Sequence, residues 1–204
     1  MRVIAGSAKG RRLDAPRGGA TRPATDRIRE TLFAILEPVL GDARVLDLFA
    51  GAGTLGIEAL SRGAARATFV ERSSEALKAL RKNIAATGFD DRAEVIAANV
   101  LSFIERSVAG PYDVVFCDPP FADVALLEAT LAHPRLARAL APEARVIVRV
   151  LKKHHPRLPD GVGVMRAKDI GEETLLFLRY DLVRTRPEAK FPGEDDGRST
   201  SGAR

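Results

Sequence analysis

The sequence has little cysteine and histidine and no long apolar run. Cys117 is its one cysteine, beside three histidines. This excludes an internal disulfide framework, fits a reducing cytoplasm and argues against a dedicated zinc site. No apolar run approaches the roughly 20 residues that a membrane span needs, and the N-terminus lacks the apolar core of a secretory signal. We therefore expect a cytoplasmic protein without a membrane segment or a metal, and take a monomer as the default.

The 204 residues are 46% hydrophobic and 29% charged, which indicates one globular domain. From residue 44 onward, short apolar runs alternate with helical spacing. The expected strands are 45–49, 67–71, 93–97, 112–117 and 145–150, and the expected helices between them are 54–61, 74–87, 100–106 and 124–132. Strands and helices that alternate in this way predict a doubly wound, mostly parallel α/β sheet, as in a Rossmann-like fold.

Three further segments complete the expected architecture. A helix capped by Thr25 or Asp26 should precede the sheet, and the segments 162–167 and 174–180 should form a C-terminal antiparallel pair, which gives seven strands. We assign residues 25–183 to this domain. Residues 184–204 contain almost no apolar residue and are expected to be a disordered tail.

The positive charge is concentrated at the N-terminus. Residues 1–30 hold eight basic and three acidic residues, so their excess equals the whole net charge of +5. Segment 1–24 reads as a strand or hairpin with loops, rich in Gly and Arg. A basic segment of this kind is typical of a surface that binds a phosphate backbone, although a solvated leader explains the charge equally well. We interpret it as a basic RNA-binding extension, with these candidate contacts: Arg11, Arg12, Arg22, Arg27 and Arg29.

A glycine-rich turn follows the first expected strand. It reads Gly51-x-Gly53-x-x-Gly56, between a strand and a helix, where open α/β sheets bind ligands. Glu71 ends the next strand, 20 residues after Gly51, where its carboxylate can accept hydrogen bonds from ribose hydroxyls. The glycines also fit a nicotinamide dinucleotide. Asp47, four residues before them, favours S-adenosylmethionine, because its carboxylate can meet the amino group of that cofactor.

A second polar motif, Asp118-Pro119-Pro120-Phe121, ends the fourth expected strand. The two prolines hold the chain extended and remove two backbone donors, so that carbonyls and the Asp118 carboxylate remain as acceptors. Phe121 offers a platform on which a flat ring can stack. An amino group on a base is a poor nucleophile until N–H···O bonds draw it toward tetrahedral geometry, so these residues suit its methylation. Taken alone, the motif is equally explained by a strand that ends in a Pro-Pro turn.

Together the two motifs resemble the class I amino-methyltransferases that act on adenine N6 or guanine N2. The N-terminal stretches 2–6, 10–13 and 22–33 narrow the resemblance to the RsmD-type 16S ribosomal RNA guanine-N2 methyltransferases, over about residues 1–181. The resemblance implies S-adenosylmethionine as cofactor and methylation of guanine 966 in the small ribosomal subunit. The substrate would be an assembled particle or a late intermediate.

The resemblance also implies roles for individual residues. Asp118 and Pro119 would bind the target amino group and Phe121 would stack on the guanine. The cofactor site would comprise Asp47, Phe49, Gly51, Gly53, Glu71 (ribose), Asn99 (adenine) and Asp118.

Two positions depart from the expected pattern. Ala24 stands where a second threonine is expected, and Arg149 stands in the fifth strand where an acid is common. If that acid helps to hold the base, Arg149 changes how the substrate is held. Two other functions stay open at this point, a nicotinamide oxidoreductase and a non-catalytic RNA-binding module. Methylation of adenine N6, of another guanine or of DNA amino groups also stays open.

Overall fold

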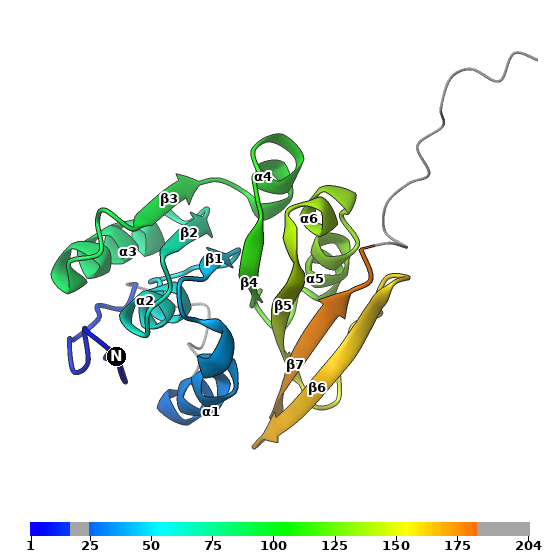
Figure 1. Cartoon of the computed structure of the whole chain (residues 1–204), viewed down its shortest axis with the longest axis horizontal. Helices are drawn as coiled ribbons and strands as arrows, with labels where there is room; N and C mark the ends of the chain where they lie inside the picture. Colours follow the sequence, from blue (N-terminus) through cyan, green and yellow to red (C-terminus); the bar gives the residue numbers. More distant parts are fainter. Residues whose placement is uncertain (17–24, 183–204) are drawn as a thin grey trace, which may run out of the picture.

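The computed structural model describes residues 1–16 and 25–182. Its centre is a seven-stranded sheet in the order β3-β2-β1-β4-β5-β7-β6 (Figure 1). Neighbouring strands from β3 to β5 are parallel, and β7 runs antiparallel between β5 and β6. The strands are β1 (Arg44–Asp47), β2 (Arg66–Glu71), β3 (Ala93–Ala97), β4 (Tyr112–Cys117), β5 (Leu140–Leu151), β6 (Val162–Ile170) and β7 (Glu173–Tyr180). The predicted fold class is confirmed, including the C-terminal antiparallel pair.

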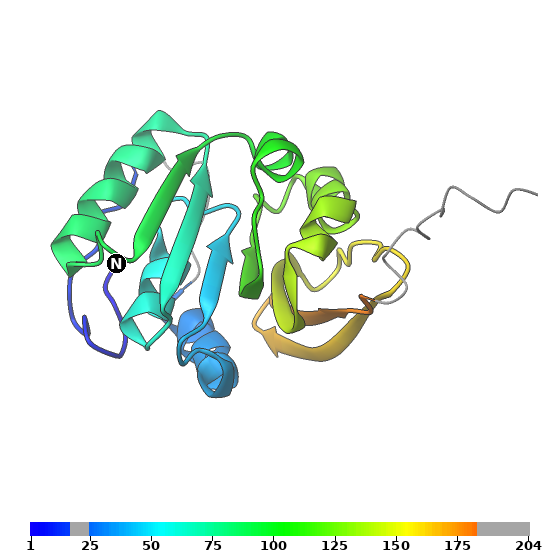
Figure 2. The ribbon, with the colours of Figure 1, turned by 45° about the horizontal axis from the view of Figure 1, so that its top comes forward.

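Helices cover both faces of the sheet (Figure 2). The first face carries α1 (Asp26–Leu36), α2 (Thr54–Ser61) and α3 (Ser74–Thr87), and a short 3-10 turn, Glu37–Val39, follows α1. The second face carries α4 (Val100–Arg106), α5 (Val124–Leu131) and α6 (Pro134–Arg138). Successive strand residues point to opposite faces, so Val114 packs in the first core and Val115 in the second. Burial on both faces explains why these strands read as nearly continuous apolar runs.

The sequence predicts most of these elements. The main errors of that prediction concern the start of β5 and the segment just before it. That strand begins at Leu140, five residues earlier than expected, and its pairing with β4 shifts register between Tyr112 and Val114. Pro142 lies in this irregular stretch, where the ladder does not need its missing N–H. The helix α6 was not predicted, because its five residues are too few to show a helical period.

The N-terminal segment 1–16 packs against the sheet's first face. Val3, Ala8 and Leu13 are buried in the same core as α1 and α2. An isolated antiparallel bridge joins Arg2 to Arg12, which is less than the expected strand or hairpin. The boundary proposed at residue 24 and the tail beyond 183 fall outside the described residues. No helix in the described parts of the chain combines the length and apolar character needed to cross a membrane.

Candidate active site

The candidate site lies where the carboxyl ends of three parallel strands meet. β1 pairs with β2 on one side and with β4 on the other, so the chain leaves β1 between the ends of its two neighbours. The Leu48 N–H donates to the Phe116 carbonyl, and the Ala50 N–H donates to the Val70 carbonyl. These bonds hold the turn after β1 in the crevice where open α/β sheets bind their ligands.

Two glycines of that turn adopt backbone conformations that other residues rarely adopt. Gly51 has φ +55° and Gly53 has φ +83°, and a Cβ atom at Gly51 would meet nothing within 4 Å. The turn therefore leaves open space above Gly51, which a ligand can approach closely. Gly56 has a different function, because a Cβ there would lie 2.2 Å from the Phe69 ring. This third glycine allows α2 to pack on β2.

Glu71, at the end of β2, is bound to the glycine-rich turn. Its Oε2 accepts a hydrogen bond of 2.8 Å from the Gly51 N–H, and its Oε1 accepts from the N–H groups of Arg72 and Ser73. A carboxylate has about four acceptor positions, so this arrangement leaves one for a ligand hydroxyl. The structure thus brings Glu71 and Gly51 together as the sequence spacing suggested.

Asn99 lies at the next strand end. The Ala98 N–H donates to the Glu71 carbonyl, which joins the end of β3 to that of β2. The side chain of Asn99 is the N-cap of α4, since its Oδ1 accepts from the Leu101 N–H. Phe49, half-buried, packs against the second core. Asn99 therefore lies at the strand end next to Glu71, and its role in binding adenine stays a prediction.

Asp47 is buried and accepts hydrogen bonds from the backbone N–H groups of Gly56 and Phe49. Burial raises the pKa of this carboxyl to about 7, and repulsion from Asp118 and Glu71 adds to the effect. Three acids from three strand ends thus share one electrostatic environment. A cluster of this charge fits the sulfonium and ammonium groups of S-adenosylmethionine, and it fits the anionic pyrophosphate of a dinucleotide poorly.

Asp118 and the residues after it form the other wall of the site. Pro119 is buried, and Pro120 accepts a hydrogen bond from the Asp123 N–H, which opens α5. Because β4 neighbours β1, Asp118 lies beside the glycine-rich turn. Burial raises the pKa of Asp118, while the nearby Arg149 guanidinium acts in the opposite direction. The expected acceptor, Asp118, and the expected stacking ring, Phe121, therefore follow the carboxyl end of β4, the strand that pairs with β1.

Arg149, the departure noted in the sequence, binds this wall directly. Its Nε lies 3.0 Å from Asp118 Oδ1, and its Nη2 lies 3.0 Å from Asp118 Oδ2. Its Nη1 lies 3.0 Å from Glu173 Oε2, and its guanidinium carbon lies 4.7 Å from the centre of the Phe121 ring. Burial is the largest single effect and lowers the pKa of Arg149, but the charges and hydrogen bonds of Asp118 and Glu173 together outweigh it, so that the pKa is raised. A cation therefore contacts both groups that were assigned to the base.

Comparison with known proteins shows what the chain is similar to. Residues 1–179 match the protein family described as "Conserved hypothetical protein 95". The chain is 41% identical, over 173 residues, to ribosomal RNA small subunit methyltransferase D of Escherichia coli K12. The aligned region covers 84% of this chain and 86% of that relative. The chain belongs to this methyltransferase D family. Solved structures agree, since the Escherichia coli protein yhhF has 38% identity and a TM-score of 0.77, over 88% of this chain and 97% of that one.

A more distant structure shows the fold alone. It is an RNA methyltransferase from Salinibacter ruber in complex with S-adenosyl-L-homocysteine, with 18% identity and a TM-score of 0.59. The match covers 76% of this chain and 92% of that one. This chain therefore shares its fold with proteins that are only distantly related to it in sequence.

The expected RNA contacts of this family member divide into three groups. Arg11, Arg12 and Arg27 are exposed, so their proposed role is compatible with the structure. Arg22 falls outside the described residues, as does Ala24. The prediction for Arg29 is wrong, because its side chain is fully buried and cannot reach a phosphate. Its Nη2 instead donates to the Arg2 carbonyl at 2.7 Å and to Asp26 at 2.8 Å.

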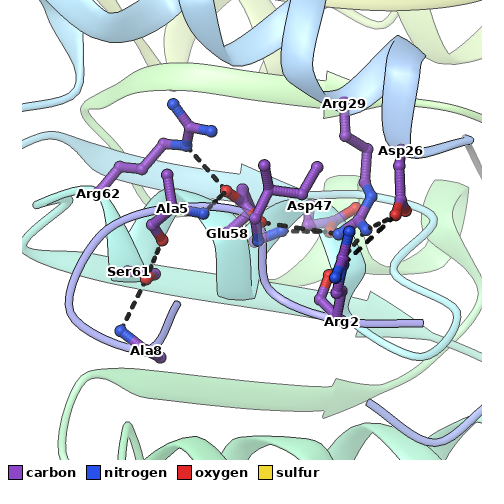
Figure 3. Close-up of polar contacts among 11 residues, drawn as sticks. Arg2, Ala5, Ala8, Asp26, Arg29, Asp47, Glu58, Ser61 and Arg62 are labelled. Carbon is purple, nitrogen blue, oxygen red and sulfur yellow. Dashed lines mark hydrogen bonds and ion pairs between the residues drawn. The ribbon is translucent and has the colours of Figure 1, made fainter. Parts of the chain in front are cut away.

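Glu58, which sequence reasoning missed, is the partner that explains the burial of Arg29 (Figure 3). The fully buried Glu58 carboxylate lies 3.6 Å from Arg29 Nη1 and 2.8 Å from Arg62 Nε. It also accepts hydrogen bonds from the backbone N–H groups of Ile4 and Ala5. One buried acid on α2 thus fixes the N-terminal segment and α1. The only signal for it in the sequence was a charge inside an otherwise apolar helix.

Proposed function

We propose that this chain transfers a methyl group from S-adenosylmethionine to the exocyclic N2 of guanine 966 in 16S ribosomal RNA of the small ribosomal subunit. The observation that carries the proposal is the placement of Asp118-Pro119-Pro120-Phe121 beside the glycine-rich turn. An acceptor for an amino group then lies next to a crevice suited to a cationic methyl donor. Membership of the methyltransferase D family supports ribosomal RNA as the substrate.

The cofactor, when bound, supplies a methyl group on a sulfonium, and the protein's contribution is to position the two reactants. Asp47, Glu71 and the N-cap Asn99 would hold the cofactor's amino, ribose and adenine groups. Asp118 would accept an N–H of the target amino group, which localises the nitrogen lone pair toward the methyl group. Burial strengthens Asp118 as an acceptor, since it raises the pKa of the carboxyl.

The RNA is proposed to lie across the face that displays Arg11, Arg12 and Arg27. Each exposed guanidinium can contact a phosphate and fix the position of the RNA without reading its sequence. Because α1 lines a cavity together with Asp118, a phosphate bound at Arg27 on the same helix would lie on the approach to the site. We also propose that the protein is cytoplasmic and monomeric. The buried free thiol of Cys117 accords with a reducing compartment.

The test is transfer of a tritiated methyl group to small subunits from cells that lack this activity, followed by nucleoside analysis. N2-methylguanosine in the 16S RNA supports the proposal. Recovery of N6-methyladenosine instead would refute the substrate while leaving the fold intact. Titration calorimetry with S-adenosylhomocysteine and with NAD tests the cofactor separately, and tight binding of NAD alone would refute a methyltransferase.

A further inference from the structure

Arg149 occupies the two contacts that a base needs in this site. Both oxygens of Asp118 accept from its guanidinium, whose central carbon lies over the Phe121 ring at 4.7 Å from its centre. The side chain of Arg149 is 9% exposed and that of Asp118 is 15% exposed, so the pair is nearly closed to solvent. The cavity that the two residues line, with Ile28 of α1 and Leu55 of α2, has a volume of about 10 Å³. That is room for about one water molecule and not for a purine.

The chemistry of the guanidinium matches that of the proposed target. The N1–H and N2–H₂ edge of guanine is also a planar set of N–H donors on a guanidine-type carbon, C2, which is bonded to three nitrogens. Such an edge can donate to the two oxygens of one carboxylate and can stack on an aromatic ring. Arg149 and the guanine edge therefore compete for Asp118 and Phe121.

Glu173 provides a second acceptor for the arginine. Its Oε2 lies 3.0 Å from Arg149 Nη1, and its side chain is also 15% exposed. Glu173 begins β7 and Arg149 lies within the adjacent β5, so the register of two paired strands fixes this partner. A guanidinium that leaves Asp118 thus keeps a carboxylate and does not become an unpaired buried charge.

We propose that Arg149 fills the base site of the RNA-free protein and must shift from Asp118 to Glu173 before the target guanine can bind. This inference rests on the proposed function and identifies a positioning residue for it. A guanine that offers two donors can compensate for the lost contacts with Asp118. A base with one donor on the edge that it presents compensates for less of them. Arg149 thereby favours binding of a guanine, which offers two donors, over binding of a base that offers one.

Two variants should change RNA affinity in opposite directions. Arg149→Met removes the competitor, so the KM for RNA should fall about 10-fold if the open state is ~10% populated. Glu173→Gln removes the second acceptor and should raise the KM for RNA by a similar factor. Arg145→Gln is the matched control, since Arg145 lies on the same strand and pairs with Glu143 away from the site. It should leave the KM for RNA unchanged.

A binding measurement separates this inference from the proposed function. RNA that carries the target guanine and a fluorescent label at one end, titrated in the presence of S-adenosylhomocysteine, reports binding through its fluorescence anisotropy without any methyl transfer. Tighter binding by Arg149→Met and weaker binding by Glu173→Gln support the displacement. A merely structural salt bridge would weaken folding in both variants and move both affinities the same way, which overturns the inference. If Arg149→Met does not fold, Glu173→Gln decides, and unchanged or tighter binding overturns it. Wild-type protein that binds this RNA and methylates no guanine refutes the proposed function alone.

Discussion

Two arginines of this protein are each buried between two carboxylates, with different surroundings. Arg29 lies between Asp26 and Glu58, and the Glu58 carboxylate also accepts from two backbone N–H groups and from Arg62. Arg149 lies between Asp118 and Glu173, and both of these carboxylates keep some contact with solvent. Glu58 is bound by fixed backbone from another segment, whereas the partners of Arg149 are side chains at strand ends. The first arrangement holds the fold together, and the second can exchange partners.

The largest expected effect tests the structural role of Glu58, the buried partner of Arg29. Glu58→Ala leaves the buried Arg29 with the half-exposed Asp26 as its acidic partner and releases the backbone of Ile4 and Ala5. We expect a loss of about 3–5 kcal/mol in the free energy of unfolding, measured by chemical denaturation. Lys78→Gln, in an exposed ion pair on α3, is the control and should cost less than about 1 kcal/mol. Similar losses in the two variants would show that the Glu58 network does not anchor the segment.

The next effect concerns Asp118, the partner of Arg149 and the proposed acceptor for the target amino group. Asp118→Ala removes the acceptor for the target amino group and should lower kcat by on the order of 10²–10³-fold, as loss of a transition-state contact does in other enzymes. Transfer of a tritiated methyl group to RNA measures this effect. Activity equal to that of the wild type would contradict the role of Asp118.

The effect of pH on Asp47 tests a residue that links the two regions. Asp47 ends β1, and its carboxylate accepts a hydrogen bond from the Gly56 N–H of α2, the helix that carries Glu58. Its pKa is about 7 in the fold against an ordinary value of 3.8, so the folded protein binds the extra proton. The contribution of Asp47 to stability without cofactor should therefore be fully present below about pH 4 and be lost as the pH rises through about 7. Asp47→Asn should abolish this decline, with a gain on the order of 1–2 kcal/mol at pH 8. Denaturation at a series of pH values measures it, and an identical decline in both proteins would exclude Asp47 as the cause.

Cofactor binding should show the opposite dependence on pH. The ammonium group of S-adenosylmethionine favours the ionised carboxylate of Asp47, so affinity should rise as the pH increases through about 7. Binding should then release a proton. Calorimetry in buffers of different ionisation enthalpy detects this release, which Asp47→Asn should lack. Proton release that persists in this variant would assign the titration to another group.

The smallest effect distinguishes buried from exposed arginines. Arg11→Gln and Arg12→Gln should each reduce the salt dependence of RNA binding by about one phosphate contact while leaving the thermal midpoint unchanged. Arg138→Gln on α6, also exposed, is the control on the opposite face of the sheet. Fluorescence anisotropy at several salt concentrations measures the slope. If the slope of RNA affinity against salt concentration is the same in all these variants and in the wild type, Arg11 and Arg12 of the N-terminal segment do not contact the RNA.

The sequence by itself determined the fold and the position of the site. Alternating apolar runs required a parallel sheet covered on both faces, and acids and glycines at strand ends had to converge at one edge of it. This is why the roles of Gly51, Glu71 and Asp118 could be proposed before the structure was known. These features are local, since each depends on a residue's position within its own strand or turn.

Only the tertiary structure decided what the arginines do. Arg29 was expected at an RNA surface, and it is buried because Glu58, 29 residues later, lies on a helix that packs against α1 and the N-terminal segment. Arg149 was noted as a missing acid, and its partners are 31 residues before it and 24 residues after it. A charge in a sequence carries no mark of its partner, because the partner is set by strand order and helix packing. The guanidinium is the same in both places, and its surroundings alone make one a structural anchor and the other, as we propose, a displaceable substitute for the base.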